Sequence, residues 1–377
     1  MAASALSVAI YLTEAFTPAP VWLLDALDRV EVTRNDSAPY GFQLVFAAER
    51  APVTSADYPV LQSSLLEVGT RIVISVNVFG QTTIIADGFI THQQLAPATP
   101  TEDAQLIVTG EDVSVQMALY EYSLEYPFAP DFVIAGLVLA KWLALGIVPE
   151  VLPTPTSWVS FNNVPQQVGN DRAYLVRLAA QHGFVFFTKP TSDLGVNTAY
   201  WGPPPRFGSA QPALTVDAGS GTTVEDIRFN YDALAPRLVY GLVEDPYFDT
   251  TVPVVTVAST RVPFLASHPA LPMNIPFMRT TLFQHQGLSA VQAYAKAQAL
   301  TNRSTDHVVT AEGSLDVLRY GSVLDAPGVV AVRGAGETYD GLYYVQEATH
   351  QISRQGYRQS FKLSREGVGS TISKVAG

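Results

Sequence analysis

A short strand pattern that occurs twice is the strongest constraint on how this chain folds. Near the C-terminus the pattern runs through Gly313, Asp340-Gly341 and His350-Gln351, and near the N-terminus through Gly69, Asp87-Gly88 and His92-Gln93. In each copy a glycine precedes a strand, and an Asp-Gly pair is predicted to turn the chain into a further strand. The pattern predicts one β-module present twice, which suits a structural part with quasi-equivalent surfaces better than an enzyme.

Alternation of apolar and polar residues predicts β-structure in both halves of the chain. From Arg71 to Val78, the side chains of Ile72, Ile74 and Val76 share one face, the period of two expected of a half-buried strand. Further strands are predicted at Tyr40 to Ala47, Thr82 to Ile85, Gly88 to His92, Gln105 to Thr109, Phe184 to Phe187, Thr198 to Trp201, Ala213 to Val216 and Arg237 to Leu242.

An apolar helix is predicted from Phe132 to Leu145. Asp131 is placed at its N-cap, and Gly146 is placed to end it. The helix is hydrophobic nearly all round, which is typical of a helix buried between layers, or of one that a partner chain covers.

Two more helices are predicted. Asp171 opens one that runs through His182 and ends at Gly183, and alanines give high helix propensity to the segment from Ser289 to Thr301. The first of these leads into the aromatic strand at Phe184, so helix and strand together predict a small α+β domain.

The composition limits the class of partner. The 377 residues accommodate about two to four domains, and the absence of cysteine excludes disulfides, thiol catalysis and cysteine-ligated zinc. A formal charge of −12 with no basic stretch argues against sequence-specific binding of duplex DNA. Charged residues make up 15% of the chain, against roughly 25% usually, which indicates a surface covered by partner chains or one rich in Thr, Ser and Gln.

Neither a signal peptide nor a membrane span is predicted. Met1 to Leu12 has no basic residue ahead of its apolar residues and is interpreted as a strand. The longest apolar run begins at Phe132 and is interrupted by Lys141, short of the roughly 20 residues that a spanning helix needs.

No motif of a catalytic, cofactor or metal site is found, so no catalytic, cofactor-binding or metal-binding residue and no cofactor is predicted. Gly219-Ser220-Gly221 lacks the lysine of a phosphate loop, and Gly334-Ala335-Gly336 lacks the third glycine of a dinucleotide site. His182 is interpreted as a helix-end cap, and His92 and His350 as a duplicated structural hydrogen bond. The histidines are too far apart for a helical zinc pair: His92, His182, His268, His285, His307 and His350.

Adjacent carboxylates are the remaining candidates for catalysis. They occur at Glu102-Asp103, Glu111-Asp112, Glu225-Asp226 and Glu244-Asp245. A glycosidase needs two carboxylates about 5 to 10 Å apart in one cleft, whereas neighbours on a strand point to opposite faces. The pairs are therefore interpreted as solvated turns or interface charges.

Three blocks of the sequence, in order and at consistent spacing, span most of the chain. They lie around Gly69, Gly88 and Leu106 to Asp112, then at Asn170 to Ala179 with Gly183 to Phe186, then from Gly313 through Gly321, Gly341, His350 and Tyr357 to Arg365. With these blocks the chain resembles the phage late control protein D family, the baseplate hub proteins of contractile tails. These are related to the hub portion of type VI secretion spike proteins and to the hubs of extracellular contractile injection systems.

The resemblance implies a β-rich α+β fold with two tail-tube-like β-barrel domains and attached α+β domains. The implied division is residues 1–112 for the first tube-like barrel, 113–205 for an α+β domain, 206–240 with 306–366 for the second barrel, 241–305 for an inserted segment with a helix, and 367–377 for a tail. The segment from about Asp245 to Met278 matches nothing in the family, and no spike follows the hub portion, so the piercing tip is expected to be a separate protein.

The implied function is that of a structural, non-enzymatic hub. Three chains would form a pseudo-six-fold ring that joins the six-fold tail tube to the three-fold central spike and lines the channel. Implied partners are two further copies of the chain, the spike, the tail tube or tube-initiator protein and baseplate wedge proteins, with the tape measure protein a further candidate. Genome or cargo would pass without specific binding, and no membrane is involved. The implied location is the tail baseplate of a virion, or a contractile injection particle, assembled in the bacterial cytoplasm.

Two alternatives from other classes stay open. One is a tail-associated enzyme that cleaves peptidoglycan or carbohydrate, and the other is a receptor-binding tail β-protein. For the hub, three copies would carry a formal charge of −36, so acidic side chains are expected to face the channel and to repel phosphate within about 8 Å.

Overall fold

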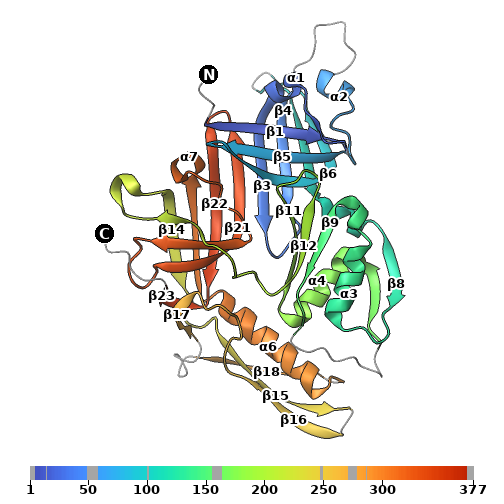
Figure 1. The fold of residues 1–377 in the computed structure, drawn as a ribbon, viewed down its shortest axis with the longest axis vertical. Helices are drawn as coiled ribbons and strands as arrows, with labels where there is room; N and C mark the ends of the chain where they lie inside the picture. Colours follow the sequence, from blue (N-terminus) through green and yellow to red (C-terminus); the bar gives the residue numbers. More distant parts are fainter. Residues whose placement is uncertain are drawn as a thin grey trace.

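A large antiparallel sheet organises the molecule, and the fold is β-rich α+β, as predicted (Figure 1). The structure, a computed structural model, describes residues 5–13, 15–48, 58–99, 102–154, 164–246, 249–270, 278–285 and 287–371. A helix-containing unit lies to one side of the sheet, and a second lies at the lower end in Figure 1. No helix in these ranges is both long and apolar enough to cross a membrane.

The first module is formed by the N-terminal part of the chain. Its elements are β1 (Leu6–Leu12), β2 (Thr17–Pro18), α1 (Val21–Ala26), β3 (Leu27–Asn35), β4 (Gly41–Ala47), α2 (Pro59–Gln62), β5 (Arg71–Val78), β6 (Gln81–Ala96) and β7 (Gln105–Asp112). The predicted strand at β5 is confirmed, and every residue of it except Asn77 is buried.

The two strands predicted at Thr82 to Ile85 and Gly88 to His92 are one strand, β6, so the predicted Asp-Gly turn at Asp87 is wrong. Gly88 lies inside the strand because β7 passes very close to it. A Cβ atom there would lie 2.0 Å from the carbonyl oxygen of Glu111. The glycine therefore serves close strand packing and not a reversal of the chain.

The second module is formed by the C-terminal part of the chain. Its elements are β13 (Gln211–Thr215), η3 (Gly219–Gly221), β14 (Val224–Tyr231), β19 (Val309–Asp316), α7 (Val317–Tyr320), β20 (Gly328–Arg333), β21 (Gly341–Ser353) and β22 (Gly356–Arg365), with β17 (Ala266–Pro269) and β23 (Gly367–Ser370) pairing beside it. Here the predicted Asp-Gly turn is confirmed, since Gly341 has a φ of 124° and begins β21. β21 and β22 form a long hairpin.

Sheet topology confirms that the two modules share one strand order, with one difference in direction: β1 pairs antiparallel with β5, whereas β13 pairs parallel with β20. The first has the strand order β3-β4-β7-β6-β5-β1, and the second has β14-β19-β22-β21-β20-β13. Two of the bulges also match. A bulge at Asp28 in β3 corresponds to one at Glu225 in β14, and a bulge at Thr91 in β6 corresponds to one at Gln346 in β21.

The matching bulges fix which residues are equivalent, and they correct the interpretation of the histidines. Counting from the bulges, His92 corresponds to Glu347, and His350 corresponds to Leu95. His350 is buried and contacts the Tyr357 hydroxyl at 2.7 Å, whereas His92 is exposed. The prediction of a duplicated histidine hydrogen bond is therefore wrong, because the sequence pattern was aligned at non-equivalent residues.

The two modules form a single sheet through direct pairing of β21 with β3. The ladder runs from Glu347 opposite Asn35 to Ser353 opposite Arg29, and Thr33 and Thr349 contact each other through their hydroxyls at 3.1 Å. One continuous hydrophobic cluster contains the buried side chains of both modules, for example Val32 and Ile352. The modules therefore share a core as well as a sheet.

The α+β unit lies between the modules in sequence. It contains η1 (Val113–Ala118), β8 (Glu121–Glu125), α3 (Asp131–Ala140), η2 (Leu143–Leu145), β9 (Ile147–Val151), β10 (Gln166–Asn170), α4 (Asp171–His182), β11 (Val185–Pro190) and β12 (Asn197–Gly202). The predicted helix α4 and its end at Gly183 are confirmed, with Asn170 as N-cap. The predicted pairing of β11 with β12 is also confirmed.

The first helix differs from its prediction. α3 ends at Ala140, and Pro130 stands at its N-cap, so Asp131 is its first residue. The chain leaves α-geometry at Trp142, whose indole N–H donates to Asp171 at 2.9 Å. Leu137 is 53% exposed, so this helix is not covered on all sides within the described part of the chain.

The inserted unit consists of β15 (Arg237–Asp245), β16 (Thr250–Thr256), β18 (Arg279–Leu282) and α6 (Ala290–Asp306). The predicted alanine-rich helix is confirmed and extends to Asp306. Ser289 and Gln292 form a reciprocal capping box at its start. Ala293 and Ala297 of α6 pack on Val239 and Val243 of the sheet.

Substitution of Gly88 tests the close approach of β6 and β7. Gly88→Ala is expected to lower the free energy of unfolding by about 1 to 3 kcal/mol, because the added methyl group would collide with the β7 backbone. Gly136→Ala in α3 is the matched control, since a Cβ there meets nothing within 4 Å. It should add about 0.5 to 1 kcal/mol. Urea unfolding measures both, and a Gly88→Ala chain as stable as the parent would contradict the packing argument.

Candidate functional site

The adjacent carboxylates do not converge in a cleft, but not all of them are solvated. Asp112 is buried and accepts hydrogen bonds from the backbone N–H groups of Tyr40 and Ser114, at 2.8 and 2.7 Å. Asp245 is also buried and accepts from the N–H of Ala290 at the start of α6. For these two residues the interpretation as surface charges is wrong, because each satisfies buried backbone donors.

The other members of these pairs are surface groups. Glu111 forms an ion pair with Arg172 at 2.7 Å, and Glu225 forms one with Arg358 at 3.3 Å. Glu102, Asp103 and Glu244 are exposed, and Asp226 contacts Ser314.

The histidines lie apart in the fold as well as in the sequence. His182 is the last residue of α4, but its Nε2 contacts Asp131 at 2.6 Å and its ring packs against Trp201. It therefore links α4 to the start of α3 rather than only capping its own helix. Across the described ranges no group of three or more His, Asp or Glu side chains is placed to hold a metal ion.

A buried ion pair joins the first module to the α+β unit. Arg71 and Asp87 form two hydrogen bonds of 2.8 Å, and both side chains are almost fully buried. The guanidinium also donates to the carbonyl oxygens of Leu145 and Gly195, and Asn197 donates to the Asp87 carboxylate. Both charged residues belong to the predicted repeat pattern, but their role is to attach a neighbouring unit.

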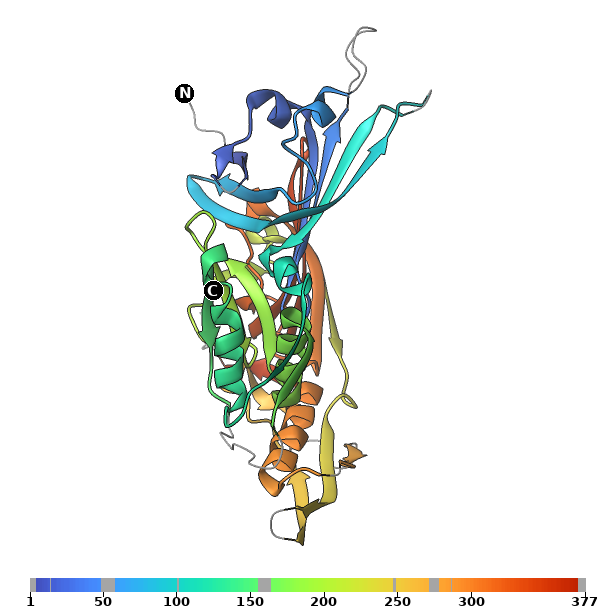
Figure 2. The ribbon, with the colours of Figure 1, turned by 90° about the vertical axis from the view of Figure 1, so that its right-hand side faces the viewer.

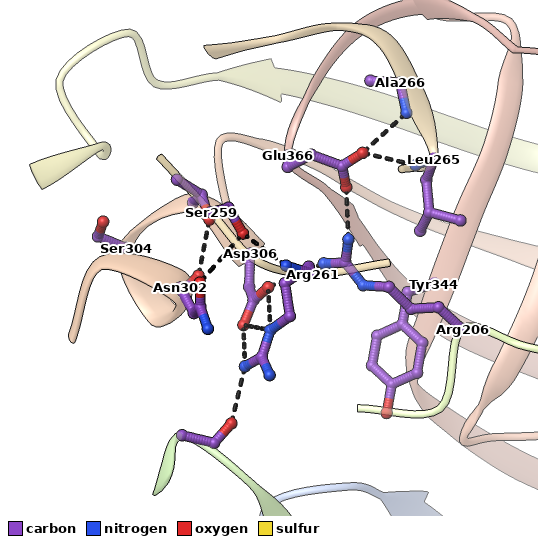
Figure 3. A network of polar contacts seen from close by, with 12 residues as sticks. Arg206, Ser259, Arg261, Leu265, Ala266, Asn302, Ser304, Asp306, Tyr344 and Glu366 are labelled. Atoms are coloured by element: carbon purple, nitrogen blue, oxygen red, sulfur yellow. Dashed lines mark hydrogen bonds and ion pairs between the residues drawn. The ribbon is translucent and has the colours of Figure 1, made fainter. Parts of the chain in front are cut away.

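A second buried network, shown in Figure 3, joins four segments that are distant in sequence. Arg206 donates to Asp306 at 2.8 Å and to Glu366 at 2.6 Å, and Arg261 donates to Asp306 at 2.8 Å and to the carbonyl of Gly183 at 2.7 Å. We call Arg206, Arg261, Asp306 and Glu366 the charged clasp. It connects the linker before the second module, the inserted unit, the end of α4 and the end of β22.

Glu366 also binds backbone donors of the inserted unit. Glu366 accepts from the backbone N–H groups of Leu265 and Ala266, at 2.5 and 2.9 Å. Removal of one partner would leave an uncompensated buried charge, which is strongly unfavourable. The network is therefore satisfied in only one arrangement of its segments.

A cavity of about 450 Å³ adjoins the clasp. Asp36, in the β3–β4 connection, lines it and accepts a hydrogen bond from Tyr344 of β21 at 2.9 Å. Burial, with the nearby Asp306 carboxylate adding to it, raises the pKa of Asp36 to about 6. Within the described chain, one carboxylate oxygen of Asp36 and the Nε of Arg206 lack a partner, and both are groups that an internal water molecule would satisfy.

Asp36 is expected to make stability depend on pH. Its pKa is raised on folding, so its favourable contribution is complete below its ordinary value of about 4 and is lost as the pH rises through about 6. Asp36→Asn should therefore raise the free energy of unfolding at pH 8 by up to about 2 to 3 kcal/mol, and the gain should vanish near pH 4.

Denaturant unfolding at several pH values checks this prediction. Asp103→Asn, at an exposed carboxylate, is the control and should change little at any pH. A loss of stability in Asp36→Asn at pH 8 would contradict the raised pKa.

One face of the large sheet is polar across eight strands. It is the side that carries Thr33 and Thr349, on the run β14-β19-β22-β21-β3-β4-β7-β6. Charges alternate along one row, in which Arg228, Glu312, Lys362 and Glu347 lie side by side. The charged residues of this polar face are Glu31, Glu111, Asp226, Glu312, Asp316 and Glu347, and Arg29, Arg228, Arg358 and Lys362.

The polar face therefore has a mixed charge with a small acidic excess. Ser, Thr, Gln and Asn fill most of the other positions, such as Gln43, Thr109 and Ser360. Figure 2 shows the α+β unit (green) on one side of strands β3 and β21. Opposite charges lie side by side on the polar face, which forms a hydrophilic wall with a hollow of about 320 Å³ beside Arg29, Asp316 and Arg358.

No model of a known protein family and no curated protein matches the sequence. Among solved structures, the chain is similar to the tail protein from Neisseria meningitidis MC58, with a TM-score of 0.61 and 15% identity over 96% of this chain and 98% of that one. It is also similar to the 43 kDa tail protein of prophage MuSo2 from Shewanella oneidensis, with a TM-score of 0.62 and 13% identity over 96% and 99% of the two chains.

A third similar structure comes from a secretion system. The E. coli c3393 protein, a component of the type VI secretion system, matches with a TM-score of 0.54 and 12% identity over 90% of this chain and 73% of its own. That protein is described as structurally similar to the T4 bacteriophage tail proteins gp27 and gp5. At these identities the similarity establishes a shared fold, which is found in phage tails and in a type VI secretion component.

Proposed function

We propose that this chain is the structural hub of a contractile-tail baseplate. Three copies form a ring with pseudo-six-fold symmetry between the six-fold tail tube and the three-fold central spike, and the ring lines the channel. The observation that carries the proposal is the pairing of β3 with β21, which joins two modules of the same strand order into one sheet. The fold shared with phage tail proteins supports it.

The symmetry argument follows from the duplication. A closed ring of three identical chains has three-fold symmetry, but two equal modules in each chain present six similar sheet segments around the axis. Such a ring fits a six-fold partner on one side and a three-fold partner on the other. The partners are therefore the tail tube or tube-initiator protein, the spike and the baseplate wedge proteins, and the tape measure protein.

The domain division belongs to the same proposal. Residues 1–112 form the first tube-like barrel, 113–205 the α+β domain, and 206–240 with 306–366 the second barrel, followed by the tail at 367–377. β15 begins at Arg237 and pairs with β16 and β18, so we assign the whole of that strand to the inserted segment.

The polar face is the part of the hub that we assign to the channel wall. Its opposite charges lie close enough to pair, as Lys362 and Glu347 do at 2.9 Å, so they present little net charge to passing cargo. Its small acidic excess repels phosphate over about 8 Å at physiological ionic strength. Genome or cargo then passes without specific binding.

A cryo-EM map of the assembled tail or injection particle tests the ring. We expect this chain in three copies at the baseplate, in the virion tail or a contractile injection particle, with the polar face toward the axis, because that face runs across both modules and the opposite face of the sheet packs on the shared core. Six copies per ring, a monomer away from the axis, or a channel lined mainly by Lys and Arg would each refute the proposal.

The role that we propose is structural and not catalytic. Zymography of the pure chain against peptidoglycan is expected to show no clearing, since the adjacent carboxylates do not converge in a cleft. Some are buried on backbone donors, some are paired at the surface, and Glu102, Asp103 and Glu244 are exposed. Clearing that is lost in Glu225→Gln with Asp226→Asn, and kept in the Asp103→Asn control, would support the enzymatic alternative instead.

A further inference from the structure

The eight-strand run of the large sheet ends in two strand edges that have no partner in its ladder. At one end, β14 pairs with β19 alone. At the other end, Ile90 of β6 still bonds to Gly69 and Thr70, but beyond Ile90 the strand pairs with β7, and in the described chain no strand lies along its other edge. Figure 2 shows the β6–β7 hairpin (cyan) projecting from the body of the molecule at the upper right. Unpaired edges of this length are sites where another strand adds.

The junction between β3 and β21 inside the chain shows how two strands of this kind can pair. At the internal junction, the outer half of β21 pairs with β3. In the repeat, β21 is the counterpart of β6, and β3 is the counterpart of β14. The two edges left unpaired in one chain are therefore the counterparts of the two edges that are joined inside it.

We propose that β14 of one copy pairs antiparallel with the outer half of β6 of the next copy, in the register of the internal junction. The number of copies in the ring rests on the proposed function, but the pairing itself rests on the repeat. The register of the β3–β21 ladder can be applied to β14 and β6 by aligning the equivalent bulges. The residues that then lie opposite each other are His92 with Asp232, Gln93 with Tyr231, Gln94 with Asn230, Leu95 with Phe229, and Ala96 with Arg228.

The chemistry of the paired residues agrees with this register. Leu95 and Phe229 are both partly buried hydrophobic residues that pack on the shared core, and the register places them opposite each other on the core side. On the polar face, Gln94 faces Asn230, the counterparts of Thr349 and Thr33, which contact at 3.1 Å in the internal junction.

A slip by one residue would destroy this match. Side chains alternate between the two faces of a strand, so such a slip would move Phe229 to the polar face.

Tyr231, which is 40% exposed in the single chain, would be covered by the neighbouring copy in the proposed register.

Disulfide trapping tests the register directly, because the natural chain has no cysteine. Directly opposed residues in an antiparallel ladder have Cα atoms about 4.5 to 5.5 Å apart, within the range that a disulfide bridges. Gln94→Cys with Asn230→Cys should therefore form covalent dimers and closed higher species on oxidation, seen on non-reducing gels and reversed by reductant. Thr33→Cys with Thr349→Cys is the positive control and should cross-link within one chain.

The matched negative control shifts one cysteine along the same strand and face. Gln94→Cys with Asp226→Cys places the second cysteine four residues away, roughly 13 Å along β14. The in-register pair should give at least about ten-fold more intermolecular product than this control. Equal products from the two pairs, or no product from Gln94→Cys with Asn230→Cys at high protein concentration, would overturn the pairing.

This failure is distinguishable from failure of the hub proposal. A particle map with a three-copy ring, but without the in-register cross-link, would leave the hub in place and overturn the register. An in-register cross-link in solution, with no ring in the particle, would support the pairing and overturn the hub.

Discussion

The backbone ladder between β3 and β21 is the interaction on which the rest of this structure depends. These strands are more than 300 residues apart at Thr33 and Thr349, so the chain must bring its two ends together before the sheet is complete. The loop-closure entropy of so long a separation grows only slowly with length. It is offset by a ladder of seven residue pairs and by the single core beneath both modules. Without this junction the modules would be two separate sheets. The polar face would then not continue from one module to the other, and the strand register of one module would not fix that of the other.

Sequence alone predicted the elements whose signal is local. β5 follows from its alternation, α4 from its initial Asp171 and terminal glycine, and α6 from its alanines. The duplication was also predictable, but the residues chosen to align it were not the equivalent ones. The repeat is conserved in backbone geometry, in strand order and in the position of two bulges. Side chains at equivalent positions differ, as Leu95 and His350 do, so a pattern of residue types cannot find the register.

The polar sites could not be predicted for a different reason. The charged clasp joins residues that are 45 to 160 positions apart, and the Arg71 pair acts through carbonyls of another unit. Each partner taken singly looks like an ordinary surface charge. Their burial arises only when the units pack, and a buried charge is tolerated because its partners are in place. The apolar character of α3 was visible in the sequence, but which of its sides is covered depends on packing that the sequence does not encode locally.

The side-chain differences between the two modules have a physical logic of their own. In the sheet the modules share the backbone path and the alternation of apolar and polar faces, although many side chains at equivalent positions differ. Where a module meets its neighbours, they diverge. Arg71 and Asp87 attach the α+β unit, and their counterparts in the second module are Val329 and Leu342. Tyr344, the counterpart of Phe89, instead contacts Asp36 beside the charged clasp. A chain built in this way presents two similar sheet segments on one side and two different flanks on the other, which is the asymmetry that the proposed hub requires between its six-fold and three-fold partners.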